Sequence, residues 1–180
     1  MTRRGERCLV RAWSSRDLEA LVRQANDPEI ARQLRDRFPH PYTRADGRAF
    51  LAGAGAGSEG PPCNFAIEVD GRVAGGIGYS RGSDVERYSA EIGYWLGRGH
   101  WGRGIATDAV HVLVGHLFDE MNLLRLYAVP LADNAASIRV LEKAGFVREA
   151  VLRCGCVKYG EPRDQLLYAR VNGTWTGARP

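Results

Sequence analysis

The sequence predicts a mixed α/β (α+β) fold, in which helices flank a mostly antiparallel sheet with one parallel pair of strands. Strand-like runs at 64–69, 73–79 and 88–96 follow one another across short turns, as in antiparallel hairpins. A long amphipathic helix at 105–121 then precedes another apolar run at 124–129. A strand–helix–strand crossover places its two strands parallel. We therefore expect the runs at 88–96 and 124–129 to form the parallel pair.

The chain opens with one short strand and a helix. The apolar run at 8–13 predicts the strand. Ser14 or Ser15 is then placed to cap a helix, because apolar residues recur at helical spacing over 18–25. We therefore expect the first helix to begin directly after this strand.

Two more helix starts precede the hairpin strands. Asp27 followed by Pro28 combines a favoured N-cap with a favoured first helical residue. Thr43 and Asp46 have the spacing of a capping box. The glycine and proline content of 53–62 predicts a loop.

Turn signals separate the remaining elements. Asp70-Gly71 predicts a tight hairpin, and 81–86 predicts a second turn. Asp133 or Asn134 is expected to cap a last helix, with Gly145 as its left-handed C-terminal residue. Three segments complete the chain, namely strands at 146–154 and 165–171 and a turn at 160–163.

Composition indicates one globular domain spanning 1–180, since 44% of the residues are hydrophobic and 26% are charged. The formal charge of +4 is spread along the chain, which suits a small polyanion and does not predict a nucleic-acid partner. The sequence has no apolar run of membrane-spanning length and no signal-peptide core, so we expect a cytoplasmic protein without a membrane partner. The 4 cysteines and 4 histidines lack metal-ligand spacing, and no metal is expected.

The segment from Gly97 to Ala106, between the third hairpin strand and the long helix, is rich in glycine and arginine. A helix N-terminus presents unpaired N–H groups and partial positive charge, which favours phosphate. Gly99, Gly102 and Gly104 permit left-handed conformations and a close approach of ligand to backbone. The segment therefore predicts an anion site, with a solvated glycine-rich turn as the alternative.

The glycines alone leave the phosphate ligand open. Gly97-x-Gly99-x-x-Gly102 matches the dinucleotide fingerprint, but that fingerprint follows the first strand of a repeated βαβ array and precedes a strand that ends in an acidic residue. Here three hairpin-type strands come first, and the next strand, at 124–129, ends in Val-Pro. The absence of a following Gly-Lys-Ser/Thr also argues against a nucleoside triphosphatase loop.

Three ordered motifs, at 91–96, 100–109 and 134–146, resemble the GNAT superfamily of acetyl-CoA-dependent N-acetyltransferases. The sequence is particularly similar to the branch that acetylates the N-termini of ribosomal proteins, and the resemblance runs from about Val10 to Val171. It implies a GNAT-like sheet whose parallel strand pair is splayed apart. Gly93 is the candidate position for the β-bulge that opens that pair, with a glycine that merely fills a tight packing position as the alternative.

The resemblance implies that acetyl-CoA is the cosubstrate. Its pyrophosphate would meet the loop backbone at Trp101, Gly102, Arg103, Gly104, Ile105 and Ala106. Its pantetheine or thioester oxygen would meet N–H groups at Tyr94, Trp95 and Leu96. The Gln or Arg that often opens the loop motif is replaced by Gly99, so we expect Arg98 or Arg103 to supply the charge.

The resemblance also assigns the chemistry. Glu91 is the expected general base, with a surface glutamate as the alternative. Asn134 would bind the pantetheine arm, cap its helix, or do both. Many relatives carry a tyrosine as general acid where this chain has Leu141, so Ser137 is the substitute candidate, unless the thiolate leaves without an acid.

Arg139 and Lys143 lie on the polar side of the same helix, where they would meet the adenosine phosphate or solvent. We expect direct attack of a primary amine on acetyl-CoA in a ternary complex; the alternative is a non-catalytic acyl-CoA-binding module. The acceptor, a protein N-terminus or a small-molecule amine, is left open because its pocket would come from the variable segments 35–42, 53–62 and 81–88. A homodimer, common among similar proteins, is compatible with the sequence.

Overall fold

A computed structural model describes residues 1–53 and 63–177. The strands are β1 (Thr2–Arg4), β2 (Leu9–Ala12), β3 (Asn64–Val69), β4 (Arg72–Arg81), β5 (Ser89–Leu96), β6 (Arg125–Ala128), β7 (Val147–Lys158) and β8 (Glu161–Val171). The α-helices are α1 (Leu18–Ala25), α2 (Pro28–Ala31), α3 (Arg44–Gly53), α4 (Ile105–Gly115) and α5 (Ala135–Lys143). Short 3₁₀ turns cover Ser15–Asp17, Asp84–Glu86 and Arg98–His100, and a π-helical turn covers His116–Glu120.

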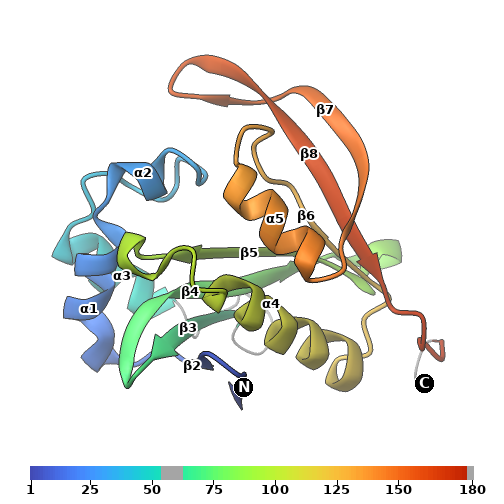
Figure 1. The fold of residues 1–180 in the computed structure, drawn as a ribbon, viewed down its shortest axis with the longest axis horizontal. Coiled ribbons are helices and arrows are strands. Elements are labelled where there is room, and N and C mark those ends of the chain that lie inside the picture. Colours follow the sequence, from blue (N-terminus) through green and yellow to red (C-terminus); the bar gives the residue numbers. More distant parts are fainter. Residues whose placement is uncertain (54–62, 178–180) are drawn as a thin grey trace.

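Within the described residues, all eight strands join one sheet in the order β1-β2-β3-β4-β5-β6-β8-β7 (Figure 1). Neighbouring strands are antiparallel except β5 and β6, which are parallel. The expected fold class is therefore confirmed. The helix α4 lies between the two parallel strands in the chain, as the crossover rule requires.

Local signals placed most of the turns and helix starts correctly. Asp70 (φ 49°) and Gly71 (φ 73°) both adopt the left-handed conformation that a two-residue hairpin turn needs. Asp27 caps α2 by accepting from the backbone N–H of Glu29 at 2.8 Å. Asp46 accepts from the backbone N–H of Thr43 at 2.8 Å, and its own backbone N–H donates to Oγ1 of Thr43 at 3.2 Å, so both halves of the predicted capping box are present.

The last hairpin is longer than predicted. Tyr159 (φ 54°) and Gly160 (φ 82°) form a two-residue turn, so the turn expected at 160–163 is wrong and Pro162 belongs to β8. A proline is tolerated there because β8 has only β7 as a partner at that level; β6 pairs with β8 from Tyr168 onward. The short strand β1 was not predicted at all.

Two hydrophobic clusters occupy opposite faces of the sheet. Side chains alternate across β5, so that Ile92 and Leu96 join the larger cluster, which includes residues of α4 and α5. Trp95 joins the smaller cluster, which includes Leu21 of α1 and Tyr42. The strand β5 therefore separates an α4/α5 face from an α1/α3 face.

An opening in the sheet begins next to Glu91. The parallel ladder ends at the pair Glu91–Tyr127, whereas β5 continues to Leu96 and β6 ends at Ala128. The expected splay is confirmed, but the predicted β-bulge at Gly93 is wrong, because the β4–β5 register runs through this residue without a shift. The opening arises because β6 ends early. Gly93 is exposed there, and nothing lies within 4 Å of the position a Cβ would take.

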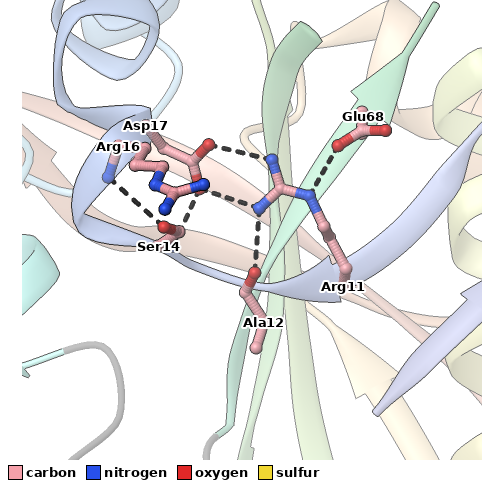
Figure 2. A network of polar contacts seen from close by, with 6 residues as sticks. All are labelled: Arg11, Ala12, Ser14, Arg16, Asp17 and Glu68. Atoms are coloured by element: carbon pink, nitrogen blue, oxygen red, sulfur yellow. Dashed lines mark hydrogen bonds and ion pairs between the residues drawn. The ribbon is translucent and has the colours of Figure 1, made fainter. Parts of the chain in front are cut away.

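A network of charged side chains joins β2 to the first helical turn and to β3 (Figure 2). Arg11 donates to both carboxylate oxygens of Asp17 at 2.8 Å and to Glu68 at 2.6 Å. The backbone N–H of Ser14 also donates to Asp17, completing the cap at the start of this turn. These contacts fix α1 against the sheet edge.

Candidate active site

The glycine-rich loop leads into an uncapped helix. Gly102 (φ 72°) and Gly104 (φ 74°) are left-handed, as expected. Gly99 instead lies in a 3₁₀ turn and does not adopt the left-handed conformation that a glycine permits. Gly104 is the N-cap of α4 and offers no side chain to the first N–H groups, which begin at Ile105. A loop of this kind can hold a phosphate through its backbone.

Two arginines border this loop, and a third turns away from it. Arg103 is exposed, and its carbonyl oxygen accepts from Nη1 of Arg7 at 3.5 Å. Arg7, in the β1–β2 turn, also lies against Gly104, with Nε 3.3 Å from the position of a Cβ. Arg98 lies 4.0 Å from the Asp27 carboxylate at the start of α2. Of the two arginines expected to supply charge, Arg98 is thus directed toward Asp27, whereas Arg103 lies beside the left-handed glycines. Arg7 is an addition that the sequence did not indicate.

An open groove of about 950 Å³ extends from the loop between the β1–β2 turn, α4 and α5. Gly104 and Thr107 line its α4 side, Arg4 its β1 side, and Lys143 its α5 side. Arg139 is exposed on α5 but does not line this groove. The groove therefore connects the N-terminus of α4 with Lys143, one of the two α5 cations expected to meet the adenosine phosphate.

Three polar residues meet at the N-terminus of α5. Asn134 caps the helix by accepting from the backbone N–H of Ser137 at 3.0 Å. The Tyr94 phenol, reaching across from β5, lies 2.9 Å from Oγ of Ser137 and donates to its carbonyl oxygen at 3.1 Å. Burial raises the pKa of Tyr94, and the hydrogen bond with Ser137 only partly opposes this, so the phenol stays protonated. Leu141 is fully buried in the larger core cluster.

Glu91 lies on the opposite face, beneath the segment that follows α2. Its side chain is 25% exposed, and its Oε1 accepts from Nη2 of Arg35. Tyr127 is its neighbour in the parallel register. Burial and the negative charges of Glu91 and Glu86 raise the pKa of the Tyr127 phenol.

The segment 35–42, one of those expected to form the acceptor pocket, borders this face. Phe38 packs edge-on against Trp95, with ring centroids 5.5 Å apart. Segment 81–88 joins β4 to β5, and most of 53–62 lies outside the described residues. Trp101 is half-exposed and donates from its indole to the Leu96 carbonyl at 2.8 Å.

Sequence reasoning missed the partners of the predicted side chains. The contact of Arg35 with Glu91 spans 56 residues, and that of Tyr94 with Ser137 spans 43. The only sequence signal for Arg35 is its place in a variable segment. In the part of the chain that is described, no group of three or more His, Cys, Asp or Glu side chains could hold a metal ion. No helix there has the length and apolar character needed to cross a membrane.

Comparison with known proteins identifies the family. The acetyltransferase (GNAT) domain family matches residues 7–147. An uncharacterized N-acetyltransferase, p20, of Bacillus licheniformis is 34% identical over 153 residues, which cover 82% of this chain and 83% of that protein. The ribosomal-protein-serine acetyltransferase of Escherichia coli K12 is 33% identical over 112 residues, covering 59% of each chain.

A solved structure agrees with this assignment. The structure of Mycobacterium smegmatis RimJ in complex with CoA-disulfide superimposes with a TM-score of 0.83 at 25% identity, and the match covers 95% of this chain and 85% of that one. The loop, the splayed strands and these likenesses agree with the resemblance seen in the sequence. The chain belongs to the GNAT family of acetyltransferases, and the enzyme class expected for it, an acetyl-CoA-dependent N-acetyltransferase, is confirmed.

Proposed function

We propose that this enzyme transfers the acetyl group of acetyl-CoA to a primary amine, on a protein N-terminus or a small molecule, by direct attack in a ternary complex. The observation that carries the proposal is the opening between β5 and β6. It separates the phosphate-type loop and Ser137, toward the α4/α5 face, from Glu91 on the other face. Donor and acceptor can therefore approach the same gap from opposite sides.

On the donor side, the pyrophosphate binds the backbone of 101–106, with Arg103 and Arg7 adding positive charge. Lys143 in the adjoining groove, or Arg139 beside it, meets the adenosine phosphate. Among the described residues, β5 has no strand partner on its β6 side after Glu91, and Tyr94, Trp95 and Leu96 lie in this stretch. Its backbone there accommodates pantetheine and the thioester oxygen, next to Asn134.

In the reaction the amine nitrogen attacks the thioester carbonyl carbon; an amide bond forms and the carbon–sulfur bond breaks. Glu91 takes the proton that the amine loses, directly or through water. Ser137 donates a proton to the departing thiolate and takes one back from solvent, and the contact with the Tyr94 phenol holds its hydroxyl in place. The demand on this donor is modest, because a thiol of pKa about 8.5 is a tolerable leaving group.

The test is acetyl-CoA turnover against a panel of amines and peptides. Glu91→Gln should lower kcat by about 100-fold or more, the usual range for loss of a general base, and leave the Kd for CoA unchanged. The matched control is Glu19→Gln, which alters an exposed glutamate of α1 paired with Arg44. Tight CoA binding without transfer to any amine would instead identify a non-catalytic acyl-CoA-binding module.

A further inference from the structure

The ion pair between Arg35 and Glu91 occupies the expected position of the acceptor amine. The Arg35 side chain is 59% exposed and Glu91 is 25% exposed, so a ligand can reach both. Arg35 belongs to the irregular stretch between α2 and α3. Its guanidinium covers one of the two carboxylate oxygens that the base would present to the acceptor.

An acceptor at this position meets both members of the pair. Oε1 of Glu91 accepts from Arg35, so the acceptor nitrogen either uses the other carboxylate oxygen, beside the guanidinium, or displaces the guanidinium. In both cases an acceptor whose only charged group is its ammonium brings a second positive charge close to Arg35. Like charges in contact repel, most strongly where water is displaced.

Two of the nearby charged side chains already have partners. Arg125, close to Tyr127 on β6, donates two hydrogen bonds to Glu149, at 2.8 and 2.5 Å. Asp36, the neighbour of Arg35 in the chain, accepts from the buried Lys158 at 2.7 Å. The Lys158 contact holds the backbone next to Arg35 against the β7–β8 hairpin, while the exposed guanidinium can swing.

We propose that Arg35 binds an anionic group of the acceptor, a carboxylate or phosphate that lies a few bonds from the reacting amine. The two charges of such an acceptor replace both partners of the Arg35–Glu91 pair, so neither residue loses a counter-charge. The planar guanidinium fork suits carboxylate and phosphate in particular. This inference rests on the proposed acetyl transfer with Glu91 as base, and it names the class of acceptor.

Matched acceptor pairs test the proposal. One pair consists of peptides that begin Asp-Ala and Asn-Ala; the other is O-phosphoethanolamine and ethanolamine. For at least one pair, the wild type should use the anionic member at least about tenfold better in kcat/KM, chiefly through a lower KM, as expected for a charged hydrogen bond. A preference for the Asp-Ala peptide would indicate an acceptor protein with an acidic N-terminal residue. A preference for O-phosphoethanolamine would indicate a small anionic amine as the acceptor.

Substitution of Arg35 separates recognition from folding. Arg35→Gln should abolish the preference by weakening use of the anionic member while use of the neutral member is retained, and Arg35→Lys should keep part of it. The matched control is Arg32→Gln, because Arg32 is also an exposed arginine in an ion pair, with Glu29 on the preceding turn. This control should keep the full preference.

Binding to the CoA-loaded protein, measured by calorimetry, gives a readout that does not depend on turnover. The wild type should bind the anionic member about tenfold more tightly, and Arg35→Gln should bind both members equally. Equal binding by the wild type, or a preference that survives Arg35→Gln, would overturn the proposal. Loss of turnover with this binding preference intact would count against the proposed function alone.

Discussion

The Asp108 carboxylate, in the first turn of α4, accepts hydrogen bonds from three consecutive backbone N–H groups, those of Glu6, Arg7 and Cys8, at 2.8–3.0 Å. It also accepts from the Cys8 thiol. A Cβ on Gly5 would lie 2.3 Å from this carboxylate, so the β1–β2 turn has room only for glycine there. One side chain thereby ties the turn that carries Arg7 to the start of the helix at the phosphate-type loop.

The same contacts should make Cys8 chemically inert. Burial, the hydrogen bond to Asp108 and its negative charge raise the pKa of the Cys8 thiol to about 12, so the reactive thiolate is scarce near neutral pH. With iodoacetamide at pH 8, Cys154, which is exposed, should be alkylated far faster than Cys8. Peptide mass spectrometry over a time course measures this, with urea-unfolded protein as the control. Equal alkylation rates of Cys8 and Cys154 in the folded protein would contradict the raised pKa of Cys8.

At the scale of elements, α5 depends on its N-cap, Asn134. The cap from Asn134 to the Ser137 N–H also fixes the residue that meets Tyr94. Loss of an N-cap costs about 1 kcal/mol, so Asn134→Ala should lower the free energy of unfolding by that amount.

Asn134→Asp tests the second role of this residue, because it retains a capping oxygen but loses the amide N–H. Its stability should match that of the wild type in urea unfolding. If the amide also binds pantetheine, both variants should raise the KM for acetyl-CoA. A normal KM in Asn134→Asp would restrict Asn134 to capping.

The network of Figure 2 joins three elements through Arg11. Arg11→Gln should destabilise the fold by about 2–4 kcal/mol, because it leaves the buried Asp17 without its cation. Burial of Asp17 opposes ionisation, but hydrogen bonds from Arg11 and Ser14 outweigh it and lower its pKa. A carboxylate with a lowered pKa stabilises the fold above its unfolded-state pKa, and this stabilisation is lost as the pH falls through the folded-state pKa.

The difference in unfolding free energy between wild type and Arg11→Gln should therefore be full at pH 7 and shrink at pH 3 and below. Urea unfolding at several pH values measures it. The double variant Arg11→Gln/Asp17→Asn should be less destabilised than the sum of the single variants. The Arg11–Asp17 pair would not stabilise the fold if the destabilisation of the double variant equalled the sum of the single variants. The same would follow if the difference between wild type and Arg11→Gln did not change with pH.

At the scale of the whole molecule, the β7–β8 hairpin extends from the sheet toward the end where α2 lies (Figure 1). Its tip meets the segment after α2 through Lys158 and Asp36, which are 122 residues apart. The Lys158 side chain is only 6% exposed. This contact forms a bridge between the hairpin tip and the segment after α2.

Asp36→Ala should loosen this bridge, because it leaves the amine of Lys158 without its carboxylate. Hydrogen exchange at the hairpin tip and in 35–42 should speed up, while exchange in α4 stays unchanged. Glu161→Gln is the control, since it removes a charge at the same tip from a residue that makes no ion pair with any described residue. If exchange were faster in both Asp36→Ala and Glu161→Gln, the loss of a negative charge, and not the loss of the Lys158 contact, would explain the change.

Whether a feature could be predicted depends on how far apart in the sequence its interacting residues lie. The helix starts at Asp27 and Asn134, the hairpin turn at Asp70-Gly71 and the left-handed Gly102 and Gly104 are predictable, because caps and turns are decided within a few residues. The parallel pair follows from element order. The bulge at Gly93 failed because the opening depends on where β6 ends.

By itself, the sequence determined the fold class, the family and the left-handed glycines before α4, since each depends on local backbone chemistry or on the order of motifs. Only the tertiary structure decided which side chains meet in the site. It placed Arg35 on Glu91, Tyr94 on Ser137 and Lys158 on Asp36, across separations of 56, 43 and 122 residues. Such contacts depend on how helices, hairpin and sheet pack together, and no local pattern records the packing of distant segments.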